Sequence, residues 1–81
     1  MKVEYFIVNR GEMILKAEEK EMLIQGEINI DPPSFNVYFG SIKNWKPPYE
    51  NEPISDGLKY RIMKALLEES RKEGNVKLYF D

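Results

Sequence analysis

Two proline-rich breaks constrain the fold of this chain more than any other feature of its sequence. The first is Asp31-Pro32-Pro33-Ser34, and the second, residues 46–53, holds three of the five prolines. Proline lacks the backbone N–H that helix interiors and central strands use, so regular structure ends at each break. The strands before the breaks are therefore separated from the one later segment that is long enough for a helix.

The residues before the first break have the pattern of antiparallel strands. Residues 2–9 are rich in Val, Tyr, Phe and Ile, and Asn9-Arg10-Gly11 supplies a turn before a second strand at residues 12–17. The charged residues 18–21 fit a solvated turn. A third strand, residues 22–30, alternates clearly, with one face made by Met22, Ile24, Gly26, Ile28 and Ile30. A glycine inside a strand predicts a bulge or, here, a close contact with the helix.

A short strand and a bend lie between the two breaks. Phe35, Val37 and Phe39 alternate with polar neighbours, which predicts a strand over residues 35–39. Gly40-Ser41 then bends the chain. We expect the aromatic side chains to form the core and cross-strand pairs rather than a nucleic-acid stacking platform. These aromatic residues are Tyr5, Phe6, Phe35, Tyr38, Phe39, Tyr79 and Phe80.

The residues after the second break predict one helix and a last strand. Ser55 is a favourable N-cap with Asp56 in the first turn, and the helix is expected to end at about Glu73 before Gly74. Lys64 and Glu68 are spaced for an i,i+4 ion pair. Residues 76–80 alternate again. The buried stripe of the helix should hold Leu58, Ile62, Ala65, Leu66 and Ser70.

Together these segments predict an α+β fold in a single domain over residues 1–81. We expect an antiparallel β-meander of four or five strands packed on one long helix, with a final C-terminal strand rejoining the sheet. Hydrophobic residues make up 42% and charged residues 32% of the chain, which is the balance of a globular domain. The sheet edges or the uncovered sheet face would remain for a partner.

The residue types that most enzymes and metal sites use are missing. Histidine and cysteine are absent, which removes the common general base, the strong nucleophile, disulfides and thiolate zinc sites. Glu50, Asn51, Glu52 and Asp56 could offer oxygen ligands, but they do not match a calcium loop. Paired carboxylates could hydrolyse a substrate, yet so thin a domain offers little depth for a pocket. We therefore expect no metal, no cofactor and no enzymatic activity.

The charge and hydropathy patterns argue against nucleic-acid and membrane partners. The formal net charge is −2, and no cluster of Lys or Arg offers the basic surface that phosphate contacts need. No apolar run is long enough for a transmembrane helix, and Glu4 stands where a signal peptide would be apolar or basic. These patterns predict a cytoplasmic protein.

The second proline break is also the candidate binding loop. It begins after Trp45, the only tryptophan, and includes Tyr49 beside Glu50 and Glu52. Trp and Tyr often anchor interfaces, and proline lowers the entropy lost on docking. The alternative is structural, with Trp45 closing the core and the prolines steering the chain into the helix. We favour the core role for Trp45 and leave both roles open for Tyr49.

One segment resembles a known family. Phe35-Asn36-Val37-Tyr38-Phe39-Gly40-Ser41-Ile42-Lys43-Asn44-Trp45-Lys46-Pro47-Pro48-Tyr49, followed by Ile54-Ser55 and the helix with Ile62, is similar to small immunity proteins of bacterial polymorphic-toxin and contact-dependent inhibition systems, most nearly immunity protein 74. The resemblance is close after the first proline break and extends before it only as a pattern of strands. Its motif residues here are Trp45, Pro47, Pro48 and Ser55.

The resemblance implies non-catalytic, one-to-one neutralisation of a cognate toxin domain, often a nuclease. A nuclease groove is basic and would attract an acidic partner. The partner-binding candidates are Tyr49, Glu50, Glu52 and Asp56, together with Glu18, Glu19 and Glu21. Two other hypotheses remain: a small interaction or regulatory module, such as a phage or accessory subunit, that pairs by a sheet edge, and an enzyme that uses carboxylates alone. The free protein is expected to be a monomer or a weak dimer.

Overall fold

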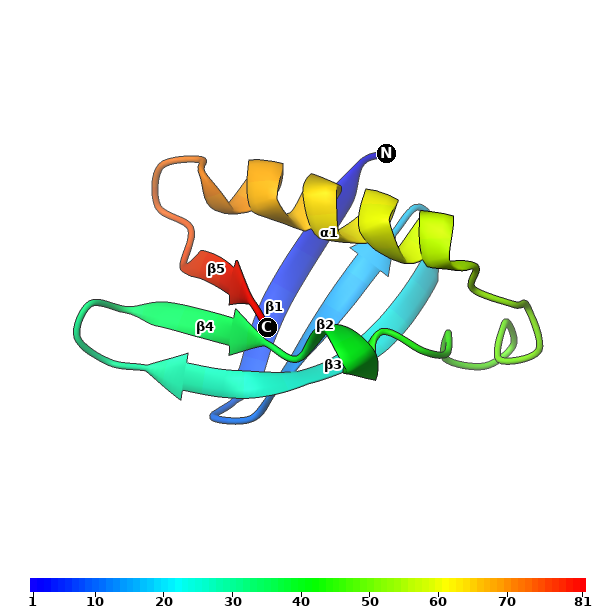
Figure 1. Cartoon of the computed structure of the whole chain (residues 1–81), viewed down its shortest axis with the longest axis horizontal. Coiled ribbons are helices and arrows are strands. Elements are labelled where there is room, and N and C mark those ends of the chain that lie inside the picture. The colour runs from blue at the N-terminus through cyan, green and yellow to red at the C-terminus, as the bar shows by residue number, and fades with distance from the viewer.

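The structure is a computed structural model that describes all 81 residues. It has five strands, one short 3₁₀ helix and one α-helix (Figure 1). The predicted α+β class is confirmed. The elements are β1 (Val3–Asn9), β2 (Glu12–Ala17), β3 (Lys20–Asn29), β4 (Ser34–Val37), η1 (Phe39–Ser41), α1 (Asp56–Ser70) and β5 (Lys77–Phe80).

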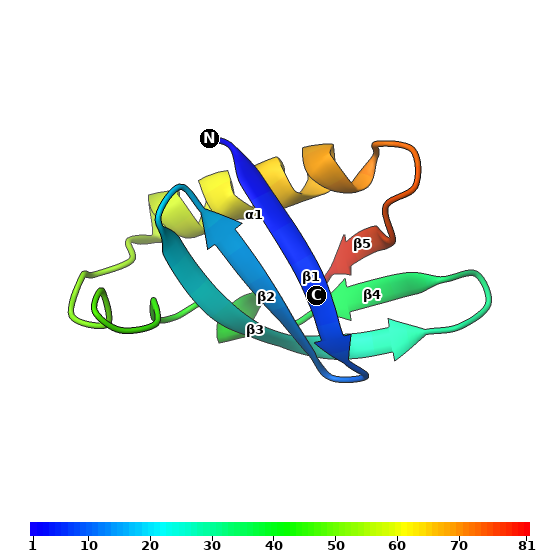
Figure 2. The same ribbon diagram turned by 180° about the vertical axis from the view of Figure 1, so that it is seen from behind.

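The five strands form one curled sheet in the order β1-β2-β3-β4-β5. Strands β1 to β4 pair antiparallel, which confirms the predicted meander. The last strand does rejoin the sheet, and it lies at the edge, parallel to β4. Helix α1 passes in front of β1 and β2 in Figure 1 and behind them in Figure 2, so it covers one face of the sheet and leaves the other uncovered.

Strand β3 belongs to both halves of the sheet, and Gly26 lies where they meet. Residues before Gly26 pair with β2, and Gly26 itself begins the pairing with β4, opposite Val37. A Cβ at position 26 would lie 2.3 Å from the Asn36 backbone oxygen and 2.4 Å from the ring of Phe35. The expected close contact therefore exists, but with β4 and not with the helix. The register irregularity of the sheet lies instead in β1, between Ile7 and Asn9.

The core lies between the sheet and α1. Ile62, Ala65, Leu66 and Ser70 are the buried residues of the helix, as the sequence predicts, while Leu58 is only partly buried. Facing them are side chains from all five strands and from the segment after η1. These are Val3, Met13, Leu15, Ala17, Met22, Ile24, Phe35, Val37, Ile42, Trp45 and Leu78.

The helix ends at Ser70, three residues before the expected Glu73. Side chains from the following segment satisfy its last carbonyls, which would otherwise lack partners. Asn75 Nδ2 donates to the Glu69 carbonyl at 2.8 Å, and Lys77 Nζ donates to the Ser70 carbonyl at 3.0 Å. The expected Lys64–Glu68 ion pair is not among the three in the structure; Glu69 pairs instead with Lys72.

Several side chains expected in the core lie on the uncovered face instead. Phe6, Tyr38 and Tyr79 are 50%, 41% and 58% exposed, because each occupies the outward position of its strand or just after it. Ile30 is 79% exposed, since β3 ends one residue earlier and its alternation stops there. The expectation of burial is correct for Phe35, which is fully buried, and for Tyr5, Phe39 and Phe80, which pack against the core.

The two edges of the sheet approach each other. Tyr5 Oη of β1 donates a 2.5 Å hydrogen bond to the carbonyl of Val76, the residue before β5. Burial, and after it the negative charge of Glu69, raises the pKa of the Tyr5 phenol above its ordinary value of 10.0. One side-chain hydrogen bond therefore links the first strand to the segment that leads into the last strand.

Candidate functional site

The segment after η1 places Trp45 in the core. Ile42 is fully buried and Trp45 is 5% exposed, so the tryptophan closes one end of the core. The chain then leaves the core in two tight turns, in which Tyr49 N donates to the Lys46 carbonyl and Glu52 N donates to the Tyr49 carbonyl, both at 3.0 Å. Pro47 and Pro48 are exposed within the first turn. The ring of Tyr49 is half-buried and packs against the core.

Lys20 joins this loop to the β2–β3 turn. Its Nζ lies 2.7 Å from Glu52 Oε1, and it sits over the rings of Trp45 and Tyr49, 5.7 Å and 5.3 Å from their centroids. The hydrogen bond that Lys20 Nζ donates to the Glu52 carboxylate raises the pKa of the Lys20 ammonium. A backbone hydrogen bond of 2.8 Å from Lys46 N to the Glu21 carbonyl adds a second link. Both acidic segments of the sequence thus meet at one end of the molecule.

We call this region the acidic end. It consists of Glu18, Glu19 and Glu21 from the β2–β3 turn and Glu50 and Glu52 from the loop. Glu52 pairs with Lys20, and Glu21 lies 4.0 Å from Lys16. The other three carboxylates take part in none of the three ion pairs of the structure and are exposed. Their negative charge is available to a partner.

Ser55 and Asp56 begin α1 and are connected to the acidic end through the loop. Ser55 Oγ accepts a 3.1 Å hydrogen bond from Leu58 N, which is the N-cap that the sequence predicts. Asp56 is exposed in the first turn, where its charge complements the helix dipole. Asp56 makes no direct link to the Lys20 cluster, so the structure gives it a helix-starting role.

The acids do not gather into a metal site. No group of three or more acidic side chains is arranged to hold an ion, and Glu52 is already engaged with an ammonium. The hollows on the surface are open to solvent. Helix α1, with 15 residues, does not meet the length and apolarity needed to span a bilayer.

The uncovered sheet face carries a feature that the sequence did not reveal. Phe6, Ile14 and Leu23 stand directly opposite one another on β1, β2 and β3, and we call them the apolar row. Phe6 is 50% and Leu23 is 40% exposed. The available signal was that β1 has apolar residues at both alternating positions, a pattern of strands covered on both faces. That Phe6 faces Ile14, and Ile14 faces Leu23, follows only from the register of the three strands.

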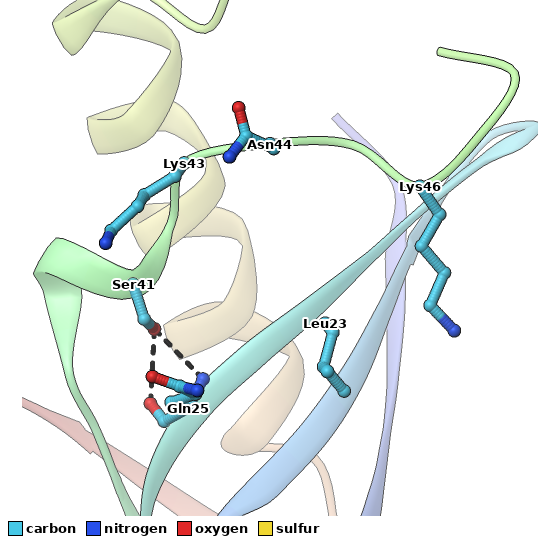
Figure 3. A pocket seen from close by; sticks show the side chains of 6 residues that line it. All are labelled: Leu23, Gln25, Ser41, Lys43, Asn44 and Lys46. Carbon is cyan, nitrogen blue, oxygen red and sulfur yellow. Dashed lines mark hydrogen bonds between the residues drawn. The ribbon is translucent and has the colours of Figure 1, made fainter. Parts of the chain in front are cut away.

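An open hollow of about 210 Å³ adjoins the apolar row at Leu23. Figure 3 shows Leu23 and Gln25 on β3, with the segment of Ser41, Lys43, Asn44 and Lys46 beside them. Ser41 fixes this segment to the strand, because its Oγ accepts from Gln25 N at 3.0 Å. The single hydroxyl proton has two acceptors in reach, the Tyr38 carbonyl at 2.7 Å and the Gln25 carbonyl at 3.3 Å. Hydrogen bonds therefore hold one wall of the hollow in place, and Lys43 and Lys46 line it.

The fold and surface are those of a small α+β domain with exposed charged and apolar areas and no deep pocket. The family model described as Immunity protein 74 matches residues 6–81, nearly the whole chain. The chain belongs to this family of immunity proteins, as its resemblance implies. No curated protein and no solved structure matches it.

Proposed function

We propose that this protein is an immunity protein that binds one cognate bacterial toxin domain and neutralises it by contact alone. The observation that carries the proposal is the family match over residues 6–81. The toxin is encoded beside the immunity gene in a polymorphic-toxin or contact-dependent inhibition system. The protein acts in the cytoplasm, where an arriving toxin would meet its target.

The acidic end supports a nuclease as the toxin. A nuclease must hold phosphates, so its groove is basic, and unpaired carboxylates can compete for that groove. Glu18, Glu19 and Glu50 are exposed and outside the ion pairs of the structure. Lys20 holds the loop and the turn together, which fixes these acids relative to one another before binding. Such preorganisation lowers the entropy lost on association.

Co-expression tests the proposal most directly. The C-terminal domain of the neighbouring gene's product should stop growth when expressed alone, and this chain should restore growth. The two purified proteins should elute together with the mass of a one-to-one complex. If the chain neither restores growth nor binds the domain, the proposal is wrong.

Charge reversal tests the role of the acidic end within that complex. Glu18→Lys with Glu19→Lys should slow association about tenfold at low salt, because exposed charges steer encounter. The matched control is Glu68→Lys with Glu73→Lys, two exposed acids in the last turn of α1 and just beyond it. Raising the ionic strength should shrink the difference between wild type and variant. Association that depends little on salt would favour strand addition at a sheet edge over acid-led binding.

Position 18 allows binding to be separated from folding. Glu18 has φ 60, in the left-handed region where a residue other than glycine costs about 1–2 kcal/mol. Glu18→Gly should therefore raise the free energy of unfolding by about 1 kcal/mol while it weakens toxin binding. Chemical denaturation and a binding titration on the same variant measure both. A variant that is more stable and binds as tightly as wild type would remove Glu18 from the interface.

A further inference from the structure

The uncovered face of β1, β2 and β3 has an ordered pattern of side chains. Across the three strands, the apolar row of Phe6, Ile14 and Leu23 is followed toward the β2–β3 turn by a second row, in which Glu4 faces Lys16 and Lys16 faces Glu21. Glu21 belongs to the acidic end. The apolar row and the acidic end are therefore neighbouring parts of one continuous surface.

This pattern has the anatomy of a protein–protein interface. Binding surfaces have an apolar centre that becomes fully desolvated, with charged residues around it. Phe6 and Leu23 are half-exposed although each could bury considerable apolar area, and α1 lies on the opposite face. The hollow beside Leu23 gives a protruding partner side chain room to enter (Figure 3).

The charges around the apolar row favour a basic partner over a second copy of this chain. One flanking row is Glu4, Lys16 and Glu21, and on the other side Glu12 faces Gln25. Neither row has a net positive charge, whereas the third side, at the hollow beside Leu23, carries Lys43 and Lys46. Two copies packed through this face would therefore set acidic rows against acidic rows, whereas a partner with a basic rim would complement them.

We propose that the apolar row is the centre of the toxin-binding surface and that the acidic end is its rim. This inference rests on the proposed function and names the surface that performs it. The partner is a toxin domain with an apolar patch that has basic residues opposite the two acidic rows and none opposite Lys43 and Lys46. The apolar row determines how long the complex lasts, and the acidic end determines how fast it forms, because desolvated centres act mainly on dissociation and rim charges on association.

The test replaces Phe6 and Leu23 with threonine, which retains strand propensity and removes apolar surface. The double variant should bind the neighbouring gene's toxin domain about tenfold or more weakly, with the change in the dissociation rate. The control is Ile30→Thr, which removes an exposed apolar side chain just beyond the end of β3 and should bind as wild type does. Thermal unfolding checks that each variant folds, and Leu23→Thr alone replaces the double variant if that one does not.

The outcomes separate this inference from the proposed function. If wild type restores growth and the threonine variants bind equally tightly, the toxin-binding surface lies elsewhere and only this inference is wrong. If wild type itself neither restores growth nor binds, the proposed function is wrong. Sedimentation of the free chain tests the other possible partner, a second copy of this chain. A dimer that the threonine substitutions dissociate would show that the row pairs with a second copy, which would also overturn the inference.

Discussion

The two halves of the sheet bury similar apolar side chains on the inner face but differ on the outer face. In the β1–β3 half, the outer face carries the apolar row of Phe6, Ile14 and Leu23. In the β3–β5 half, the equivalent row is Glu27, Asn36 and Tyr79, which face one another across the strands. One sheet therefore has a water-facing half and a half suited to contact.

Two members of this row, which we call the polar row, have hydrogen-bond partners within the protein: Glu27 and Asn36. Asn36 Nδ2 donates to Asp81 Oδ2 at 3.0 Å, and Tyr38 Oη donates to Glu27 Oε2 at 3.4 Å. The negative charge of Glu27 is the main cause of a raised pKa at Tyr38. Nothing comparable completes the apolar row, because apolar side chains gain only by losing water. The β1–β3 half therefore has more apolar surface to bury against a partner.

The largest expected effect comes from the junction of the two halves. Gly26→Ala should lower the free energy of unfolding by about 3 kcal/mol, since the new methyl would overlap the Asn36 carbonyl and the ring of Phe35. Urea denaturation measures the loss. Adding Phe35→Leu should recover little, because the backbone oxygen remains in the way. Gly40→Ala is the control, as a Cβ there meets nothing within 4 Å and should cost little.

The link between the two outer edges should have the next largest effect. Tyr5→Phe removes the hydrogen bond to the Val76 carbonyl and should cost about 1 kcal/mol. If the unfolding free energy of Tyr5→Phe equals that of wild type, the sheet edges are held together by packing alone.

Tyr5 also makes a prediction about pH. Its pKa in the folded protein lies above the ordinary 10.0, so folding favours the neutral phenol. That contribution is complete below pH of about 10 and is lost as the pH rises through the folded pKa. Wild type should therefore lose stability in alkali more steeply than Tyr5→Phe. Denaturation midpoints of wild type and Tyr5→Phe, measured from about pH 8 to about pH 11, give the difference in stability.

The outer faces of the two halves should respond differently to matched substitutions. Asn36→Ala should cost about 0.5–1 kcal/mol of stability and leave toxin binding unchanged, because it breaks a hydrogen bond in the polar row. Leu23→Thr should cost about 0.5 kcal/mol or less and weaken binding. Unfolding and binding titrations on both variants make the comparison. Equal effects on binding would mean that the two halves do not differ in function.

The smallest effect concerns the polar row alone. Glu27→Gln removes the main cause of the raised pKa of Tyr38, so this phenol should titrate at lower pH while the fold is unchanged. The measurement is phenolate absorbance as a function of pH. Subtracting the curve of the Glu27→Gln, Tyr38→Phe double variant from that of Glu27→Gln leaves the titration of Tyr38. A titration curve identical to that of wild type would show that Tyr38 and Glu27 do not interact in solution.

Sequence periodicity predicted most of the fold but little of the surface. The strands, the helix and the Ser55 N-cap depend on local residue order, which alternation and capping preferences describe well. The end of α1 was misplaced because its caps come from Asn75 and Lys77, farther along the chain. A glycine inside a strand predicts a close contact, but the identity of the neighbour, Phe35, depends on the pairing of β3 with β4.

The candidate site shows the same division. The sequence predicts both acidic segments as binding candidates, yet for Lys20 it predicts only a place in a solvated turn. Its contacts with Glu52 and Tyr49 join residues about thirty positions apart, and no local pattern encodes such a distance. The apolar row likewise needs the register of three strands before it becomes a row.

The parallel pairing of β4 with β5 also affects the order in which the sheet can form during synthesis. Ser34 pairs with Lys77, so β4 lacks its neighbour on that side until the ribosome has added roughly forty further residues, which takes about 2–8 seconds. During that interval the nascent chain has β4 as an open edge, which is hazardous for aggregation.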